Sequence, residues 1–325
     1  MPATGFVSTG HLPAAASVAA AVREAHARFR GTSDGSPSTV YPALGRADPD
    51  AFGICLVDVD GESHAVGAVD TPFTIMSVAK PFVFALACRA RGAERVRELV
   101  GVDATGLPFN SVAAVEGSPD GRTNPMVNAG AIQTTALVPG ATPDERWAAI
   151  SDGLSAFAGR PLELDAEVYA SASATNDVNR ALAWLLNVRG RMTGDPDVAL
   201  DLYTRQSALA VTARDLAVMG ATLADGGVNP LTKEQVLPAE LCHHVLAVMV
   251  VAGLYESSGD WFYRVGLPAK SGIGGGIVTV SPGKGGLGTY SPPLDAAGNS
   301  VRGQLVARHL SAGLGLDLLA SAPAP

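Results

Sequence analysis

Cysteine is scarce in this chain, with three residues in 325. Cys55, Cys88 and Cys242 are far apart and set in apolar stretches, and an odd number of cysteines does not indicate a disulfide framework. Buried free thiols are typical of proteins that stay in a reducing compartment. The cysteine content therefore predicts a cytoplasmic protein.

Charged residues are also few, at 17% of the chain, with a net charge of −8 and no basic run. A nucleic-acid partner is not expected, because phosphate binding needs concentrated Lys and Arg. No apolar run reaches the roughly 18–20 residues that span a bilayer. Residues 1–20 lack the basic and apolar regions of a signal peptide. We expect neither a membrane partner nor export.

Two patterns that can indicate a metal or a cofactor lack their usual context. His243 and His244 are adjacent, so on a helix they would face different directions, and no Cys/His cluster accompanies them. Gly283-x-Gly285-x-x-Gly288 matches a dinucleotide fingerprint, but the "TYSPPLD" that follows cannot open a helix. We predict no metal, no cofactor, and a hairpin turn at the glycines.

Hydrophobic residues make up 47% of the chain and follow two periodicities. Residues 52–68 alternate around Asp60-Gly61, a strong hairpin signal, and strand patterns return near residues 275–294. Helical patterns dominate in between. This order predicts an α+β fold, with an antiparallel sheet from both chain ends and an inserted helical subdomain. The expected parts are residues 1–36 (helix and linker) and 37–325 (one catalytic domain, with sheet in 37–76 and 235–325 and helices in 77–234).

The stretch "IMSVAK" places Ser77 three residues before Lys80, so both side chains would share one face of a helix. Pro81 is harmless only near a helix N-terminus, which predicts that the helix begins close to Ser77. The helix dipole would favour an alkoxide there, and a desolvated Lys80 could act as a base. The same spacing recurs at Ser281–Lys284 in a Pro/Gly turn, so spacing alone does not define a catalytic pair.

Two further motifs supply partners for that pair. Asn128 lies in a polar loop in "PMVNAGAI". Lys270-Ser271-Gly272 lies at the edge of a strand pattern, where glycine lets a substrate approach the backbone. Ser-x-x-Lys, an Asn loop and Lys-Ser-Gly are the components of the serine β-lactamase and penicillin-binding-protein architecture. Their order along the chain agrees with the predicted fold.

Longer blocks extend this comparison over residues 40–310. They are "SVAKPF", "NPMVNAGAI", "NRALAWLL", "VTARDLAVMGATLADGGVNP", "VGLPAKSGIGGGI" and "SPPLDAAGNSVRG". With these blocks the chain resembles the bacterial-type, serine-dependent glutaminases, which share the β-lactamase-like fold. The resemblance implies hydrolysis of a small-molecule carboxamide through an acyl-enzyme, release of ammonia, no cofactor, and assembly into homodimers or homotetramers.

The resemblance also implies roles for individual catalytic residues. Ser77 would be the nucleophile, and Lys80 would activate it. Tyr203 and Tyr255 would lie over the reacting centre as proton carriers or orienting groups. Without the resemblance, a core ring with a satisfied hydroxyl is the favoured interpretation of either tyrosine.

Substrate-binding residues follow from the same comparison. The backbone N–H groups of Ser77 and Ile273 would form an oxyanion hole, which usually contributes a few kcal/mol to transition-state stabilisation. Asn128 and Asn179 would hold polar groups of the substrate, and Lys270, in the neighbouring strand, is also expected to bind it.

The chain departs from the family pattern where that pattern has Glu, Arg, Gln and Tyr. The corresponding residues here are Ala172, Val178, Met76 and Val40. The Glu receives the α-ammonium of glutamine in the family, and a buried ammonium without a carboxylate typically costs a few kcal/mol. We hypothesise that free L-glutamine is a poor substrate and that the preferred amide, or other acyl group, lacks a charged α-amine.

Alternatives remain open from the sequence. Asp177 or Glu167 could take over the role of the missing Glu, and Tyr41 could substitute for the Tyr replaced by Val40. A penicillin-recognising acyl transferase or lactam hydrolase would share the motifs but would be exported. A non-catalytic ligand-binding homologue would share the fold. The true substrate, the general base and the oligomer size are not fixed by these patterns.

Overall fold

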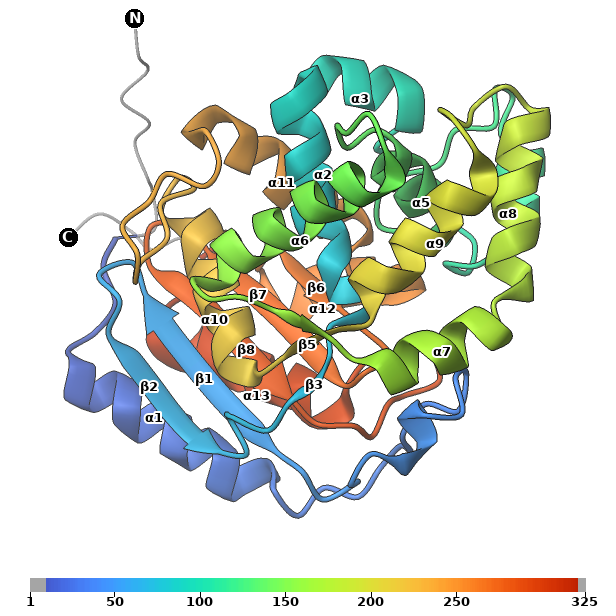
Figure 1. The fold of residues 1–325 in the computed structure, drawn as a ribbon. Helices are drawn as coiled ribbons and strands as arrows, with labels where there is room; N and C mark the ends of the chain where they lie inside the picture. The colour runs from blue at the N-terminus through green and yellow to red at the C-terminus, as the bar shows by residue number, and fades with distance from the viewer. Residues whose placement is uncertain (1–9, 321–325) are drawn as a thin grey trace, which may run out of the picture.

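The computed structural model describes residues 10–320, which form a central sheet with helices on both faces (Figure 1). Five antiparallel strands form the main sheet in the order β2-β1-β8-β7-β6. Their bounds are β1 Gly53–Asp58, β2 Ser63–Gly67, β6 Ala269–Ser271, β7 Gly276–Ser281 and β8 Gly285–Tyr290. The sheet therefore joins an early segment of the chain to a late one, as predicted.

Both predicted hairpins are confirmed. β1 and β2 pair around a turn in which Gly61 has a φ of 98°, a conformation that favours glycine. β7 and β8 pair across a turn that contains Gly283, so this glycine-rich segment is a hairpin. The side chains of Ser281 and Lys284 bond backbone carbonyls of residues 316 and 315, so the second Ser-x-x-Lys copy serves the packing of the chain end.

One face of the sheet is covered by α10 (Ala213–Ala224), which lies on β8, β7 and β1 (Figure 1). Gly286 and Gly288 of β8 make this contact possible, because a Cβ on either would overlap backbone atoms of α10. The helix and the strand thus pack backbone to backbone.

The opposite face is covered by α1 (Ala15–Phe29) and α13 (Val301–Leu314), with α12 (Ser258–Val265) beside them. Alternation along β1 separates the two faces. Ile54 and Leu56 pack into the core under α1 and α13, whereas Cys55 and Val57 pack against α10.

The remaining helices form a layer around α2, whose residues 79–88 are all buried. Their bounds are α2 Ala79–Arg91, α3 Ala93–Val100, α4 Val112–Glu116, α5 Asn128–Ala136, α6 Pro143–Ala158, α7 Ala166–Ala174, α8 Asp177–Val188, α9 Pro196–Ser207 and α11 Ala239–Ala252. Short 3₁₀ turns cover η1 Leu44–Arg46, η2 Met76–Val78 and η3 Tyr255–Ser257. A second, small sheet consists of β3 Phe73–Thr74, β5 Leu209–Val211 and β4 Glu163–Leu164.

Two helices cross the division that the sequence suggested at residue 234. α10 precedes this point but packs on the main sheet, because its apolar face meets the glycines of β8. α11 follows it but packs on α2 in the helical layer. The two layers therefore interleave along the chain.

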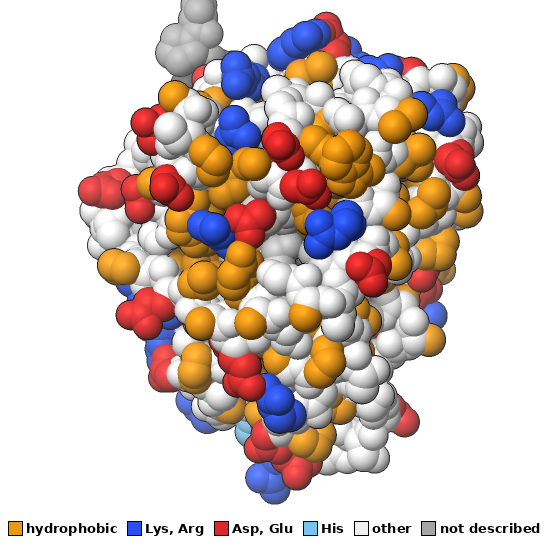
Figure 2. All heavy atoms as spheres, turned by 45° about the vertical axis from the view of Figure 1, so that its right-hand side comes forward, with side chains coloured by type: hydrophobic (Ala, Val, Ile, Leu, Met, Phe, Trp, Pro, Cys, Tyr) orange, Lys and Arg blue, Asp and Glu red, His pale blue; other side chains and the backbone are white. Residues whose placement is uncertain are grey.

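The surface carried by α7, α8 and α9 mixes side chains of all kinds. Figure 2 turns this side of the molecule toward the viewer and shows acidic, basic and apolar groups interspersed, with a hollow near the middle. Among residues 10–320, no single helix is long and apolar enough to cross a membrane; α11 and residues 255–265 pass that test only as a pair, bent by 96°.

Candidate active site

A cavity of about 120 Å³ opens where η2, α5, α8 and α9 meet the loop that follows β6. Its wall consists of Val40, Tyr41, Met76, Ser77, Phe109, Asn110, Asn128, Thr175, Asn176, Val178, Asn179, Tyr203, Ser207 and Ile273. Seven of the predicted site residues line it, namely Val40, Met76, Ser77, Asn128, Asn179, Tyr203 and Ile273. Four others are buried outside the wall, namely Lys80, Ala172, Tyr255 and Lys270.

Ser77 lies in η2, directly before α2, so the helix begins where Pro81 predicts. The backbone of the preceding residue, Met76, has a φ of 48°. Only Met76, Lys233 and Tyr255 among the described non-glycine residues have positive φ, and two of these three lie at or against this cavity. Strained backbone of this kind clusters at functional sites, since the surrounding structure must hold it in place.

Lys80 is fully buried one turn after Ser77, and its Nζ donates hydrogen bonds to Asn128 Oδ1 at 2.7 Å and to Met126 O at 3.1 Å. Burial lowers the pKa of Lys80 from 10.5 to about 7, because desolvation disfavours the ammonium. Neither partner carries a charge that would offset this. A substantial fraction of Lys80 is therefore a neutral amine at neutral pH.

A chain of buried amides extends from Lys80 along the cavity wall. Asn128 Nδ2 donates to Asn179 Oδ1 at 2.8 Å, and Asn179 Nδ2 donates to Asn176 Oδ1 at 2.5 Å. The Tyr203 hydroxyl donates to Asn128 Oδ1 at 3.2 Å, and burial raises the pKa of Tyr203 well above its usual value. These bonds fix each amide in one orientation and keep the wall polar without a charge.

The hydroxyl of Tyr255 lies between Ser77 and β6. The hydroxyl lies near the Ser77 side chain and donates to Ser271 O at 3.3 Å. Burial raises the pKa of Tyr255 to about 12, so the phenol is protonated at neutral pH. Its ring packs against Phe109 with the centroids 4.5 Å apart. The Tyr255 hydroxyl is thus placed to exchange a proton with Ser77.

Lys270 lies behind Tyr255 and does not reach the cavity. Its Nζ is 4.0 Å from the centroid of the Tyr255 ring and donates to Gly253 O and Ser271 O, each at 2.7 Å. Burial, and then the charge of nearby Lys80, lower the pKa of Lys270 well below its usual value. This position favours a role in fixing the tyrosine and β6 over direct contact with a substrate.

The glycines after β6 bring the backbone of Ile273 beside Ser77. A Cβ on Gly272 would lie 2.9 Å from Ile75 O and 3.3 Å from Ser77 N, which is closer than side chains normally come. Only glycine allows this approach. The backbone N–H groups of Ser77 and Ile273 therefore belong to neighbouring segments, as an oxyanion hole requires.

The four departures from the family pattern lie at different depths. Ala172 is buried in α7 with 3% of its surface exposed, and Met76 also has 3% exposed. Val40 and Val178 are 58% and 50% exposed, although both line the cavity.

Neither acid that could replace the missing Glu lies in the cavity wall. Glu167 forms an ion pair with Arg46, and Asp177 is exposed at the start of α8. Within residues 10–320, the wall of this cavity contains no Asp, Glu, Lys or Arg. Helices α2, α5 and α8 all begin beside it, so their positive dipole ends add to a field that opposes a bound cation.

Several wall residues were missed by the sequence analysis. Phe109, Asn110 and Ser207 come from segments without a strong motif. Thr175 and Asn176 fall in the polar break "ATND" between two helical patterns, which is the one local signal that could have indicated them.

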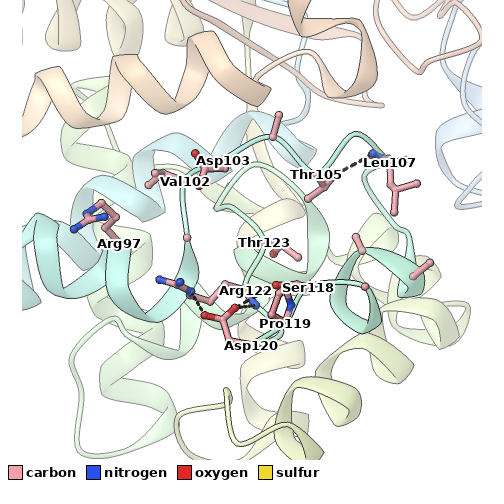
Figure 3. Close-up of a pocket in the computed structure, with 15 residues that line it drawn as sticks. Arg97, Val102, Asp103, Thr105, Leu107, Ser118, Pro119, Asp120, Arg122 and Thr123 are labelled. Carbon is pink, nitrogen blue, oxygen red and sulfur yellow. Dashed lines mark hydrogen bonds and ion pairs between the residues drawn. The ribbon is translucent and has the colours of Figure 1, made fainter.

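A larger cavity, of about 630 Å³, lies next to the site but shares no wall residue with it. Figure 3 shows its lining, which includes an ion pair between Asp120 and Arg122. Leu107 lines this cavity, whereas Phe109 and Asn110, in the same loop, line the smaller one. None of the predicted site residues is part of the larger cavity.

Comparisons with known proteins agree with this geometry. A family model described as Glutaminase matches residues 35–319. Glutaminase 2 of Yersinia pestis is 63% identical over 318 residues, which covers 98% of this chain and 94% of the relative. Glutaminase 2 of Bradyrhizobium diazoefficiens is 48% identical over 91% of this chain, which spans about half (47%) of that relative's length. The solved structure of the probable glutaminase ybaS is similar with a TM-score of 0.93 at 42% identity, covering 94% of this chain and 99% of the other.

The layered sheet and helices define an α+β protein with the β-lactamase-like fold. The chain belongs to the glutaminase family and is a hydrolase of linear carbon–nitrogen bonds that acts on a small-molecule amide. This assignment favours an amidohydrolase over the exported lactam-type enzyme and over a non-catalytic binder.

Proposed function

We propose that the protein hydrolyses a carboxamide through an acyl-enzyme on Ser77. The Ser77 oxygen would attack the amide carbon and form a C–O bond while its proton passes to a base. That proton would then move to the amide nitrogen as the C–N bond breaks, which releases ammonia. Water would attack the ester, the C–O bond to Ser77 would break, and the serine would regain a proton as the carboxylate leaves.

Lys80 is the base that the geometry supports best. A neutral amine has two N–H bonds, and the carbonyl oxygens of Met126 and Asn128 account for both. The nitrogen lone pair is then available for the Ser77 proton, since Ser77 lies one helical turn earlier. Tyr255, whose hydroxyl lies near Ser77 and is protonated at neutral pH, would deliver a proton to the leaving nitrogen.

We further propose that the preferred amide carries no charged α-amine. The observation that supports this most directly is a cavity wall that is polar but contains no carboxylate among the residues described. An ammonium there would lose its hydration and meet the positive ends of three helices. Free L-glutamine, to which the names of the relatives refer, is the alternative substrate.

Ammonia release separates these substrates. We expect N-acetylglutamine and the deaminated monoamide of glutaric acid to be hydrolysed with at least tenfold higher kcat/KM than L-glutamine. A diazoketone analogue of the better substrate should add covalently to Ser77, as read by mass spectrometry of the digested protein. Robust turnover of L-glutamine at millimolar KM would contradict the substrate proposal. Full activity in Ser77→Ala would contradict the mechanism.

We also propose that the protein works in the cytoplasm as a homodimer or homotetramer. Cys55, Cys88 and Cys242 are free and buried, which suits a reducing compartment. On α8, Trp184 and Val188 are 46% and 80% exposed, and apolar side chains of this size are common in subunit contacts. Light scattering after size-exclusion chromatography measures the oligomer size, and a monomer at micromolar concentration would contradict this proposal.

A further inference from the structure

The candidate active site has polar side chains beside Met76 at its inner end and two valines at its mouth. Ser77, Asn128 and Asn179 are at most 9% exposed and mark the inner end. Val40 is 58% exposed and Val178 is 50% exposed, yet both line the same cavity. A substrate whose carboxamide reaches Ser77 can therefore place its other end against these two valines.

The valines are held on facing segments by bonds to their neighbours. The Tyr41 hydroxyl lies 3.4 Å from Asn176 Oδ1, which ties the segment of Val40 to the segment of Val178. Ala43 N donates to Ser171 Oγ at 3.3 Å, so residues 40–43 run along α7. These two bonds hold the segment of Val40 beside α7 and the start of α8.

Charged groups near the mouth are engaged elsewhere or exposed to solvent. Arg180 pairs with Asp197 at 3.3 Å on the outer side of α8. Asp177 precedes Val178 but is exposed and is not part of the wall. The other exposed wall residues at the mouth are Asn110 and Thr175, which are uncharged hydrogen-bonding groups.

We propose that Val40 and Val178 form a subsite for a short aliphatic acyl group on the α-nitrogen of the substrate. The substrate class is then an N-acylated glutamine, whose acyl methylenes pack between the valines. Asn110 and Thr175 bond the carbonyl and the N–H of the acyl amide. The inference rests on the proposed function, because it requires that the enzyme accept an amide without a charged α-amine.

The experiment measures ammonia release from N-acetyl-, N-propionyl- and N-butyrylglutamine. Burying one methylene against apolar side chains is worth about a threefold gain in affinity. The expected kcat/KM therefore rises roughly threefold at each step, or about tenfold from acetyl to butyryl. A flat or falling series would overturn the proposal.

Threonine variants locate the subsite. Val40→Thr and Val178→Thr keep the shape of the side chain and make it polar, and at exposed positions they should fold normally. Each should reduce the butyryl-to-acetyl ratio of kcat/KM about threefold. The control is Val251→Thr, on α11 and 41% exposed but outside the cavity wall, which should keep the wild-type ratio. Equal ratios in all three variants would overturn the assignment of the subsite.

Failure of this inference can be told apart from failure of the proposed function. If the deaminated monoamide is hydrolysed well but the acyl series is flat, the proposed function stands and the acyl subsite is refuted. If only L-glutamine is hydrolysed, both are refuted.

Discussion

Replacing Lys80 with methionine should abolish turnover and, near neutral pH, make the folded protein more stable. The wild-type amine is fully buried without a carboxylate partner, and burial lowers its pKa from 10.5 to about 7. At about 1.4 kcal/mol for each pH unit, this difference corresponds to about 5 kcal/mol of destabilisation when Lys80 is charged. Methionine fills a similar volume and has no charge to desolvate.

Two lost hydrogen bonds reduce the stability that the Lys80→Met variant gains over wild type. Removing Nζ leaves Met126 O and Asn128 Oδ1 without this donor, which costs about 1–2 kcal/mol for each acceptor. Near pH 7 the variant should therefore be more stable than wild type by about 2 kcal/mol.

The sign should invert at high pH. Because the folded pKa is about 7 and the unfolded value is 10.5, the unfolded chain binds more protons between these limits, and wild-type stability rises with pH across that window. Above about pH 10, wild type no longer carries most of the cost of burying a charged Lys80. The variant still lacks the two hydrogen bonds, so it becomes the less stable protein by about 2 kcal/mol.

Urea unfolding of both proteins at pH 6, 8 and 10 measures this crossover. The difference in the free energy of unfolding should favour Lys80→Met at pH 6 and wild type at pH 10. Ammonia release should be lost in the variant at every pH. A stability difference that does not change with pH would show that Lys80 is not the buried, nearly neutral amine described above.

Three further predictions concern residues in the cavity wall and next to it. Asn128→Asp puts a carboxylate at the 2.7 Å contact with Lys80, which should raise the pKa of Lys80 and move the acid limb of the kcat/KM profile to higher pH; an unmoved limb would argue against Lys80 as the base. Gly272→Ala should lower kcat at least tenfold because its Cβ pushes on the Ser77 backbone, whereas Gly259→Ala, with open space at its Cβ, should be neutral in the same assay. Ala172→Glu should raise kcat/KM for L-glutamine relative to N-acetylglutamine at least tenfold, and the exposed Ala174→Glu on the same helix should not; equal effects would exclude a specific ammonium contact.

The main sheet could be predicted where its signals are local. The turn at Gly61 and the hairpin of β7 and β8 follow from alternation and turn residues within about 20 positions. The strands of the small sheet are only two or three residues long, so they have no periodicity to detect. The place of α10 depends on Gly286 and Gly288, some 70 residues later, and no pattern within the helix itself indicates this contact.

In the candidate site, too, features with local signals could be predicted from sequence, whereas long-range contacts could not. The helix start that presents Ser77 and Lys80 could be predicted because Pro81 and the three-residue spacing are local. The contact between Lys80 and Asn128 joins residues 48 positions apart, so only the resemblance to a family brought them together in advance. Lys270 could not be placed behind Tyr255 from sequence, because a lysine in a strand pattern indicates neither burial nor which ring covers it.

The choice of an amide as the partner of Lys80 ties stability to function. A carboxylate at position 128 would stabilise the folded protein by pairing with the ammonium, but a paired ammonium has no lone pair with which to accept the serine proton. An amide oxygen accepts one N–H bond and leaves the pKa of Lys80 near 7. The same amide donates a hydrogen bond from its own N–H to Asn179. The neutral side chains that hold Lys80 therefore also form the uncharged wall. Under the proposed function, such a pocket would discriminate against cationic groups because the side chains that hold the proposed base carry no charge.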